Sequence, residues 1–302
     1  MDPRITLLRS TLSQAIVGKE DAIALTLAAF IAGGHALLED VPGVGKTLLA
    51  KSLAKVIRGT FQRIQCTPDL LPTDITGTSV WNPQNGRFEF LPGPIFGNIV
   101  LADEINRATP RTQSALLEVM EEQQVTVDGQ TRPVPSPFFV IATQNPVEYQ
   151  GTYPLPEAQL DRFAVCFSLG YPSEAEELQI LTRLEQGSPL QSLSATTTLE
   201  DIQALRQLCL QVKVASPLQT YIVNLLRATR SHPDLALGAS PRATVMLQRL
   251  GQAWALLQGS PYVTPDMIKV LVPYVLVHRL IPHSGKSAAS IVAALLDTIP
   301  VP

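Results

Sequence analysis

The chain has 302 residues, of which 45% are hydrophobic and 16% are charged, against about 25% charged residues in a typical globular domain. This composition excludes a disordered chain, and the length predicts roughly two domains. The 23 basic and 26 acidic residues give a net charge of −3, and no long basic run is present, which argues against binding to nucleic acid.

The N-terminal residues lack the charged and apolar regions of a signal peptide. The longest apolar run, Ala22 to Leu38, spans about 17 residues and contains glycines and a histidine, so it favours a buried helix and strand over a membrane span. The three cysteines, Cys66, Cys166 and Cys209, lack the paired spacing of a disulfide framework or a zinc site. We therefore expect a cytoplasmic protein with no membrane span.

The first half of the chain alternates short apolar runs with helical patterns. Helical patterns at Thr47–Arg58 and Pro110–Glu122 lie between runs with strand character. Those runs are His35–Leu38, Phe61–Ile64, Asn98–Leu101, Phe138–Ala142 and Ala164–Ser168. This alternation predicts a mainly parallel five-stranded sheet that helices cover on both faces.

Two segments that interrupt this alternation have the pattern of β-hairpins. The segment "SVWNPQNGRFEF" contains Asn85-Gly86 between strand-like arms, and "QVTVDGQTRPV" contains Asp128-Gly129. Asn-Gly and Asp-Gly readily adopt the positive φ that tight hairpin turns require. The pattern alone fits a plain extension of the sheet as well as a surface for a partner.

The second half of the chain has a different rhythm. Residues 187–197 are rich in Ser, Thr, Pro and Gly, which is typical of a linker. Helix-start signals then recur, at Thr198 with Asp201, Ser216-Pro217, Ser240-Pro241 and Thr264-Pro265. We expect an α/β domain at residues 1–187 and a small all-helical domain of four or five helices at 188–302.

The segment "LLEDVPGVGKT" lies between a predicted strand and a predicted helix, which is where a phosphate-binding loop occurs. Gly43 and Gly45 allow backbone N–H groups to face phosphate oxygens, Lys46 would reach the β- and γ-phosphates, and Thr47 would place its hydroxyl on Mg²⁺. Asp40 stands where the usual pattern has its first glycine. Because a side chain at the loop entry need not face the phosphates, we expect this substitution to cost little.

Polar residues follow two of the predicted strands. The strand in "GNIVLADEINRA" ends in Asp103-Glu104, where an aspartate can hold a metal and the neighbouring carboxylate can activate water as a general base. The strand in "PFFVIATQNP" ends in Gln144 and Asn145, at the edge where α/β sheets bind ligands. Asn145 would bind the attacking water or the γ-phosphate; alternatively, it only forms a turn with Pro146.

Taken together, these segments resemble the AAA+ ATPases and, among them, the MoxR family, over nearly the whole chain. "LLEDVPGVGKT" is similar to Walker A, "IVLADEINRA" to Walker B and "ATQNP" to sensor 1. "GTYPLPEAQLDRF" is similar to the arginine-finger segment, and "GASPRA" to sensor 2. Five motifs in the family's order and spacing are highly specific, whereas each one alone is not.

The resemblance implies a P-loop αβα sandwich with two inserted hairpins and a C-terminal helical lid. It implies ATP and Mg²⁺ as cofactors, bound between the two domains at the carboxyl edge of the sheet. The catalytic residues it implies are Glu104, Asn145 and Arg162, and the metal ligands are Thr47 and Asp103. The nucleotide-binding residues it implies are Val17, Gly18, Pro42, Gly43, Val44, Gly45, Lys46, Thr47, Leu48 and Arg242.

The arginines have roles that the resemblance implies and the residues leave open. Arg162 would touch the γ-phosphate bound by a neighbouring subunit; the alternative is an ordinary salt bridge beside Asp161. Arg242 would contact the phosphates of its own subunit, or else lie solvated at a helix start. Arg107 and Arg111 would face a neighbour or solvent. The segment "AIVGKEDAI", with Val17 and Gly18, resembles the part that packs near adenine, although a plain helix entry has the same pattern.

As a function, the resemblance implies an ATPase that works in a ring, a hexamer in the family, and remodels or matures protein complexes. Its partners are often proteins with a von Willebrand factor A domain, and the two hairpins would contact partners. One alternative is a nucleic-acid-stimulated AAA+ motor, against which the low basic content argues. Another is a nucleotide-dependent scaffold that does not hydrolyse ATP.

Overall fold

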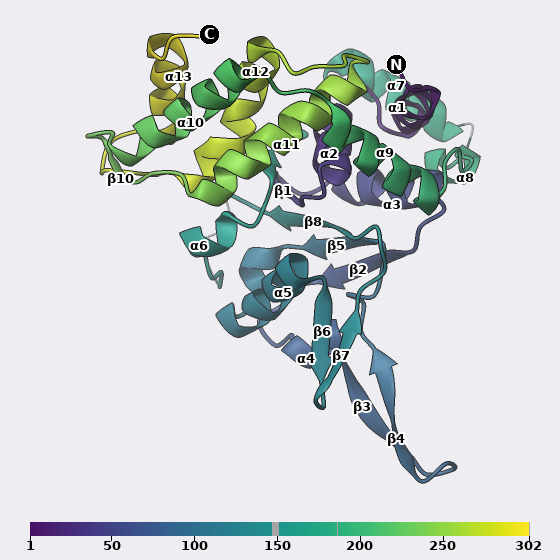
Figure 1. Cartoon of the computed structure of the whole chain (residues 1–302). Coiled ribbons are helices and arrows are strands. Elements are labelled where there is room, and N and C mark those ends of the chain that lie inside the picture. The colour runs from purple at the N-terminus through teal and green to yellow at the C-terminus, as the bar shows by residue number, and fades with distance from the viewer. Residues whose placement is uncertain (147–150, 186, 302) are drawn as a thin grey trace.

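The computed structural model describes residues 1–146, 151–185 and 187–301 (Figure 1). Five parallel strands form one sheet in the order β2-β5-β8-β1-β9, which confirms the predicted parallel sheet. The strands are β1 (Ala36–Glu39), β2 (Phe61–Gln65), β5 (Ile99–Asp103), β8 (Phe139–Gln144) and β9 (Val165–Phe167). Each overlaps one of the apolar runs that the sequence marks as strands, with ends displaced by at most two residues.

Helices cover both faces of the sheet because successive strand residues point to opposite sides. Leu38 and Ile141 enter a core with helices α1, α2 and α3, whereas Leu37 and Val140 enter a second core with α5. The helices are α1 (Pro3–Ala15), α2 (Glu20–Ile31), α3 (Lys46–Val56) and α5 (Pro110–Glu122). The carboxyl ends of the strands lie between these layers, and the predicted site residues follow them.

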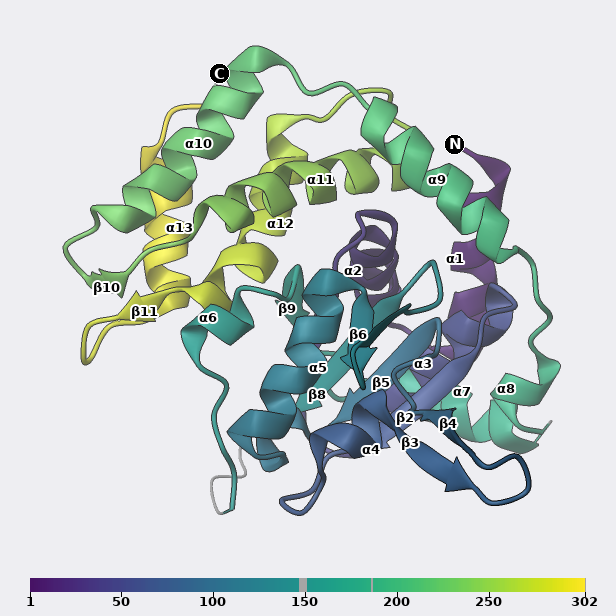
Figure 2. The ribbon, with the colours of Figure 1, turned by 60° about the horizontal axis from the view of Figure 1, so that its bottom comes forward.

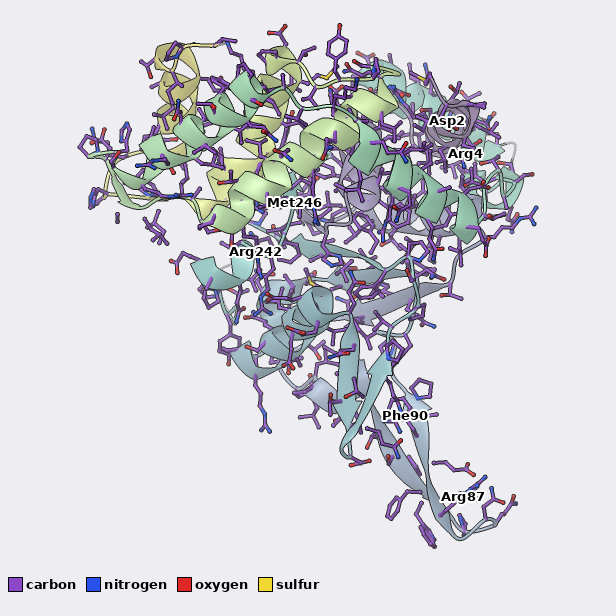
Figure 3. The ribbon with its side chains drawn as sticks, in the orientation of Figure 1. Asp2, Arg4, Arg87, Phe90, Arg242 and Met246 are labelled. Atoms are coloured by element: carbon purple, nitrogen blue, oxygen red, sulfur yellow. The ribbon has the colours of Figure 1, made fainter. Side chains whose placement is uncertain are left out.

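Both predicted hairpins are present, and in Figure 1 they extend from the sheet away from the C-terminal helices. The first consists of β3 (Gly77–Asn82) and β4 (Arg87–Pro92), and the second of β6 (Gln124–Val127) and β7 (Gln130–Pro133). The guanidinium carbon of Arg132 lies 4.1 Å from the centre of the Phe90 ring, so the two hairpins touch. Figure 3 labels Phe90, and Arg87 nearer the tip.

The two hairpin turns differ from each other. Asp128 and Gly129 both have positive φ, 52° and 72°, as the predicted tight turn requires. In the first hairpin only Gly86 of the Asn85-Gly86 pair has positive φ, and four residues connect the arms. The predicted tight Asn-Gly turn is therefore wrong: the longer connection closes when the Gly86 N–H donates to Asn82 O at 2.9 Å.

The lid is helical apart from a short ribbon formed by β10 (Leu235–Leu237) and β11 (Ile281–Pro282). Thr198, Ser240 and Thr264 cap their helices as predicted, each accepting a hydrogen bond from a backbone N–H three residues on. Ser216 is not a cap, because its helix begins one residue earlier than expected and Ala215 takes that position. The lid helices are α9 (Leu199–Gln211), α10 (Ser216–Arg230), α11 (Pro241–Leu257), α12 (Pro265–Leu276) and α13 (Ala288–Thr298).

The lid packs on the sheet domain through α2, which contacts both α9 and α11 (Figure 2). The remaining helices are α4 (Pro72–Thr76), α6 (Glu157–Leu160), α7 (Glu174–Glu185) and α8 (Pro189–Ser192). Short 3-10 turns span Ile105–Arg107 and Val277–Arg279. Within the described parts of the chain, none of the helices combines the length and apolar character that a bilayer crossing needs.

One buried histidine connects α5 to the sheet. His35 donates from Nε2 to Met120 O at 3.1 Å and accepts at Nδ1 from the Val140 N–H at 3.0 Å, so the folded chain requires its neutral form. Burial lowers the pKa of His35 from 6.5 to about 4. Between these values the unfolded chain binds more protons than the folded chain does. The stabilisation is therefore complete above pH 6.5 and decreases as the pH falls toward 4.

We expect replacement of His35 by glutamine to flatten this pH dependence. The variant should be less stable than the wild type at neutral pH, because it loses packing and one of the two hydrogen bonds. As the pH falls from 6.5 toward 4, the variant should lose less additional stability than the wild type. The reason is that protonation linked to His35 costs the wild type roughly 1.4 kcal/mol per pH unit. Urea unfolding of both proteins across this range measures the two slopes, and equal slopes would contradict the assignment.

Candidate functional site

The phosphate loop, residues 40–47, connects β1 to α3 at the carboxyl edge of the sheet. Gly43 and Gly45 have φ values of +89° and +100°, a left-handed conformation that side chains other than glycine rarely adopt. Gly45 precedes the first residue of α3, so the free N–H groups of the helix N-terminus face the loop. This arrangement of backbone donors is suited to an anion such as a phosphate group.

A charged cavity of about 480 Å³ opens beside the loop. It brings together most of the residues predicted from the Walker and sensor 1 segments. These residues are Pro42, Gly43, Gly45, Lys46, Thr47, Leu48, Asp103, Glu104 and Asn145. Segments that are distant in the sequence therefore meet at one edge of the sheet, as the motif order predicts.

Lys46 places its ammonium at the entry of the loop. Its Nζ donates to the backbone oxygens of Asp40 at 2.9 Å and Val41 at 2.8 Å. Burial lowers the pKa of the Lys46 ammonium, while the charges of Asp40, Asp103 and Glu104 oppose this shift. The lysine thus holds a positive charge where phosphate oxygens would lie.

The two carboxylates at the end of β5 are fixed by Thr143 of β8. The Thr143 hydroxyl donates to Asp103 Oδ1 at 2.7 Å and accepts from the Glu104 N–H at 2.9 Å. Glu104 has φ of +56°, which is uncommon outside glycine and occurs frequently at functional sites. The hydroxyl therefore helps to hold the backbone turn that presents the Glu104 side chain to the cavity.

Strand β2 contributes two further residues to this cavity, Arg63 and Gln65, which were not predicted from the sequence. Arg63 Nη2 lies 2.6 Å from Asp103 Oδ2, and Gln65 Nε2 donates to Glu104 Oε2 at 3.1 Å. Arg107 also contacts Glu104, with Nη1 3.2 Å from Oε2. Both carboxylates thus have fixed polar partners in this structure.

An apolar cavity of about 380 Å³ lies on the other side of the phosphate loop and shares Gly43, Gly45 and Leu48 with the charged cavity. The predicted residues Val17 and Val44 line it. Gly18 does not, since it lines a separate cavity beside Lys19 and Tyr274. The opposite wall comes from a segment that was not predicted to take part, and consists of Pro172, Ile180, Arg183, Leu184 and Pro189.

Arg162 and Arg242 line neither of these two cavities and instead meet at Glu121, near the end of α5. Arg162 Nε lies 3.2 Å from Glu121 Oε2, and Arg242 Nη2 pairs with Glu121 Oε1. Figure 3 shows Arg242 at the end of α11 that faces the sheet domain. The structure therefore does not bring Arg242 to the phosphate loop of its own chain, contrary to the expectation from the sensor 2 resemblance.

The physical reason lies in a buried ion pair beside Arg162. Asp161 accepts from Ser240, the cap of α11, at 2.8 Å and pairs with Arg279 Nε at 3.0 Å. The Arg279 side chain is 2% exposed, and burial lowers its pKa to about 10, against the opposing effect of Asp161. These contacts hold the start of α11 next to the segment that carries Arg162. The salt bridge of Arg162 is with Glu121, while Asp161 pairs with Arg279.

Arg111 is exposed in the first turn of α5, and Arg107 pairs with Glu104 as described above. Pro146, the turn partner considered for Asn145, is exposed, and residues 147–150 that follow it lie outside the described residues.

Comparison with known proteins agrees with this geometry. Residues 35–165 match the model of the ATPase family associated with various cellular activities (AAA), and residues 227–295 match the AAA lid domain. The fold, with its phosphate loop and adjoining carboxylates, is that of an AAA+ ATPase, an enzyme that binds and hydrolyses ATP.

Whole-chain similarity defines the family more narrowly. The chain is 44% identical to Chaperone MoxR1 of Mycobacterium tuberculosis, over 88% of this chain and 72% of that protein. It is 51% identical to Uncharacterized protein YeaC of Bacillus subtilis, over 96% of this chain and 92% of that protein. The solved structure of a candidate ATPase from Cytophaga hutchinsonii superposes with a TM-score of 0.93 at 38% identity, covering 99% and 95% of the two chains. The chain therefore belongs to the MoxR family of AAA+ ATPases.

Proposed function

We propose that this ATPase works as a hexameric ring that uses ATP hydrolysis to remodel or mature protein complexes. The observation that carries the proposal is the position of Arg162 and Arg242. They sit together on Glu121 and outside the charged cavity of their own chain. Arginines placed in this way can complete the site of a neighbouring subunit, which makes hydrolysis depend on assembly.

ATP would occupy the two cavities that meet at the phosphate loop. The charged cavity offers Lys46 and the N-terminus of α3 to the phosphates, and the apolar cavity offers a largely non-polar lining to the adenine. Leu48 and the loop glycines line both cavities, so one loop would contact the base and the phosphates at the same time.

The donor set of the charged cavity suits Mg²⁺. Thr47 supplies a hydroxyl oxygen and Asp103 a carboxylate, and Mg²⁺ prefers such hard oxygen ligands together with phosphate oxygens and water. Bound there, the ion would neutralise charge on the β- and γ-phosphates. We assign Thr47 and Asp103 as its protein ligands.

In this proposal Glu104 takes a proton from the attacking water. Its carboxylate lines the charged cavity, and Gln65 and Arg107 hold it in one orientation. Asn145 lines the same cavity from the end of β8 and would orient the water or the γ-phosphate. Arg162 and Arg242 of the adjacent subunit would then stabilise the charge that develops on the transferred phosphoryl group.

The name of the relative MoxR1, a chaperone, supports protein complexes as the target, and we propose a von Willebrand factor A domain protein as the partner.

The first hairpin offers a contact surface for such a partner. Trp81 is 51% exposed and Phe88 69% exposed, and their ring centres lie 5.3 Å apart in an edge-to-face pair. Exposed aromatic pairs of this kind are common anchors in protein interfaces.

If two neighbouring subunits form each nucleotide site, ATP turnover depends on protein concentration. We expect the turnover per subunit to rise with concentration and to follow the appearance of the ring in sedimentation-velocity experiments, since a lone subunit lacks its neighbour's arginines. The turnover of a self-sufficient monomer would stay constant on dilution. Constant turnover with no assembly would contradict the proposal, and strong stimulation by DNA that salt abolishes would favour a nucleic-acid motor.

A further inference from the structure

We infer that Asp40 is a positioning residue that joins the phosphate loop to the far wall of the apolar cavity and so sets the distance between the two halves of the nucleotide site. The inference rests on the proposed binding of the base in the apolar cavity. It gives a role to the residue that departs from the usual phosphate-loop pattern, in which a glycine stands at this position.

Asp40 follows strand β1, which lies between β8 and the edge strand β9, and it is bonded to the segments on both sides. It is 5% exposed, and its N–H donates to Gln144 O at the end of β8 at 3.1 Å. Its carboxylate accepts from the Ser168 hydroxyl at 3.2 Å, from the Gly170 N–H at 3.3 Å and from the Leu169 N–H. The side chain therefore faces the segment after β9 and lines neither cavity.

These bonds extend the sheet beyond the point where its ladder stops. The pairing of β1 with β9 ends at Leu38 and Phe167, so the next N–H groups of the β9 segment have no strand partner. Leu169 is buried, and a buried N–H without an acceptor is costly. The Asp40 carboxylate takes the place of the missing ladder bonds, which a glycine does not do.

The segment that Asp40 holds leads directly to the far wall of the apolar cavity. From Gly170 the chain continues to Pro172 and then to α7, whose Ile180 and Leu184 line that cavity. None of the α7 residues, Glu174–Glu185, is buried, so core packing does not fix the position of this helix. Its position depends on tethers, of which Asp40 is one and the bonds from Arg183 to the end of α1 are another.

Nucleotide binding by variants of Asp40 tests this role, with inorganic tripolyphosphate as a probe that lacks the base. For Asp40→Gly, which restores the usual motif, we expect the dissociation constant of ATP to rise by at least about tenfold and that of tripolyphosphate by less than about threefold. Asp40→Asn keeps one acceptor oxygen and should fall between. Glu39→Gln, which changes the adjacent carboxyl group, should keep both constants within about twofold of the wild type.

Isothermal titration calorimetry on the full chain measures these constants. Equal weakening of ATP and tripolyphosphate, or no weakening, would overturn the role of Asp40. If the wild type itself binds ATP no more tightly than tripolyphosphate, the placement of the base fails, and that result is distinct from a failure of Asp40. If Asp40→Gly does not fold, the dissociation constants of ATP and tripolyphosphate are compared for Asp40→Asn and Ser168→Ala instead. We expect a smaller loss of ATP affinity for Ser168→Ala, because it removes a single donor.

Discussion

Replacement of Glu104 by glutamine should reduce ATP turnover by about two to four orders of magnitude, the range that a general base contributes. The amide has the size of the carboxylate and still accepts hydrogen bonds from Gln65 and Arg107. It does not accept a proton from water at neutral pH. In the proposed site Lys46 and the loop hold the phosphates, so we expect the dissociation constant of ATP to change by less than about threefold.

Steady-state turnover and direct ATP binding separate the two effects. Asp297→Asn is a matched control, since Asp297 is an exposed carboxylate of α13 that lines neither cavity of the proposed nucleotide site, and it should retain wild-type turnover. Wild-type turnover in Glu104→Gln would remove Glu104 from the role of base. Loss of ATP binding in that variant would show instead that the site needs the Glu104 carboxylate to bind ATP.

The variant that holds ATP also provides a test for the hairpin surface. If the enzyme works as the proposed ring, a ring that does not complete hydrolysis should keep its client bound, and affinity capture with Glu104→Gln should retain the partner protein. Adding Trp81→Ser and Phe88→Ser should release that partner, because it removes the exposed aromatic pair while leaving the nucleotide site intact. Equal capture by both proteins would place the client elsewhere on the ring.

The parts of the structure that follow from the sequence are those whose signals are local. Helix α5 has the predicted bounds, Pro110–Glu122, because Pro110 opens its first turn and Thr109 accepts a hydrogen bond from the Thr112 N–H. In the phosphate loop, residues of fixed spacing determine both the backbone conformation and the chemistry. Gly43 and Gly45 thus have the positive φ that the pattern requires.

The residues that were not predicted reach the site through pairing between distant segments. Strand β2 lies beside β5 with Gln65 opposite Asp103, which brings Arg63 and Gln65 to the carboxylates. In the sequence "FQRIQ" the alternation of polar residues is typical of many strands and does not reveal which strand is the neighbour. The strand order, which is a property of the whole fold, decides the outcome.

The wall of the apolar cavity and the carboxylate of Glu121 were missed for related reasons. Ile180 and Leu184 lie in an ordinary helical pattern, and nothing in that pattern marks a helix that covers a cavity. Glu121 belongs to no motif, and its importance follows from the two arginines that it joins. The motif that contains Arg242 predicted an arginine at the start of a lid helix, but not where the lid places that arginine.

Replacement of Arg162 by alanine should reduce ATP turnover by about three to five orders of magnitude and leave ATP binding largely intact. This is the result expected for an arginine that acts on the phosphate bound by the neighbouring subunit. The structural reason is that Arg162 lies on Glu121 and outside the charged cavity, so its loss removes nothing from the site that holds ATP in the same chain. Full turnover in Arg162→Ala would refute this assignment.

Mixing inactive variants decides whether the arginine acts on its own chain or on its neighbour. A subunit with Arg162→Ala keeps Glu104, and a subunit with Glu104→Gln keeps Arg162. If the arginine acts across the interface, mixed rings contain complete sites, and an equal mixture should recover about a quarter of the wild-type turnover. An arginine that acts within its own chain predicts no recovery.

The same logic tests Arg242, for which the sequence and the structure give different expectations. If both arginines serve the neighbour, every site receives them from one subunit, so a mixture of Arg162→Ala with Arg242→Ala stays inactive. If Arg242 serves its own chain, an Arg162→Ala subunit next to an Arg242→Ala subunit has a complete site, and turnover returns. Because Glu121 holds the two arginines together, we expect the mixture to stay inactive. Arg242→Ala mixed with Glu104→Gln should then recover turnover, as Arg162→Ala does.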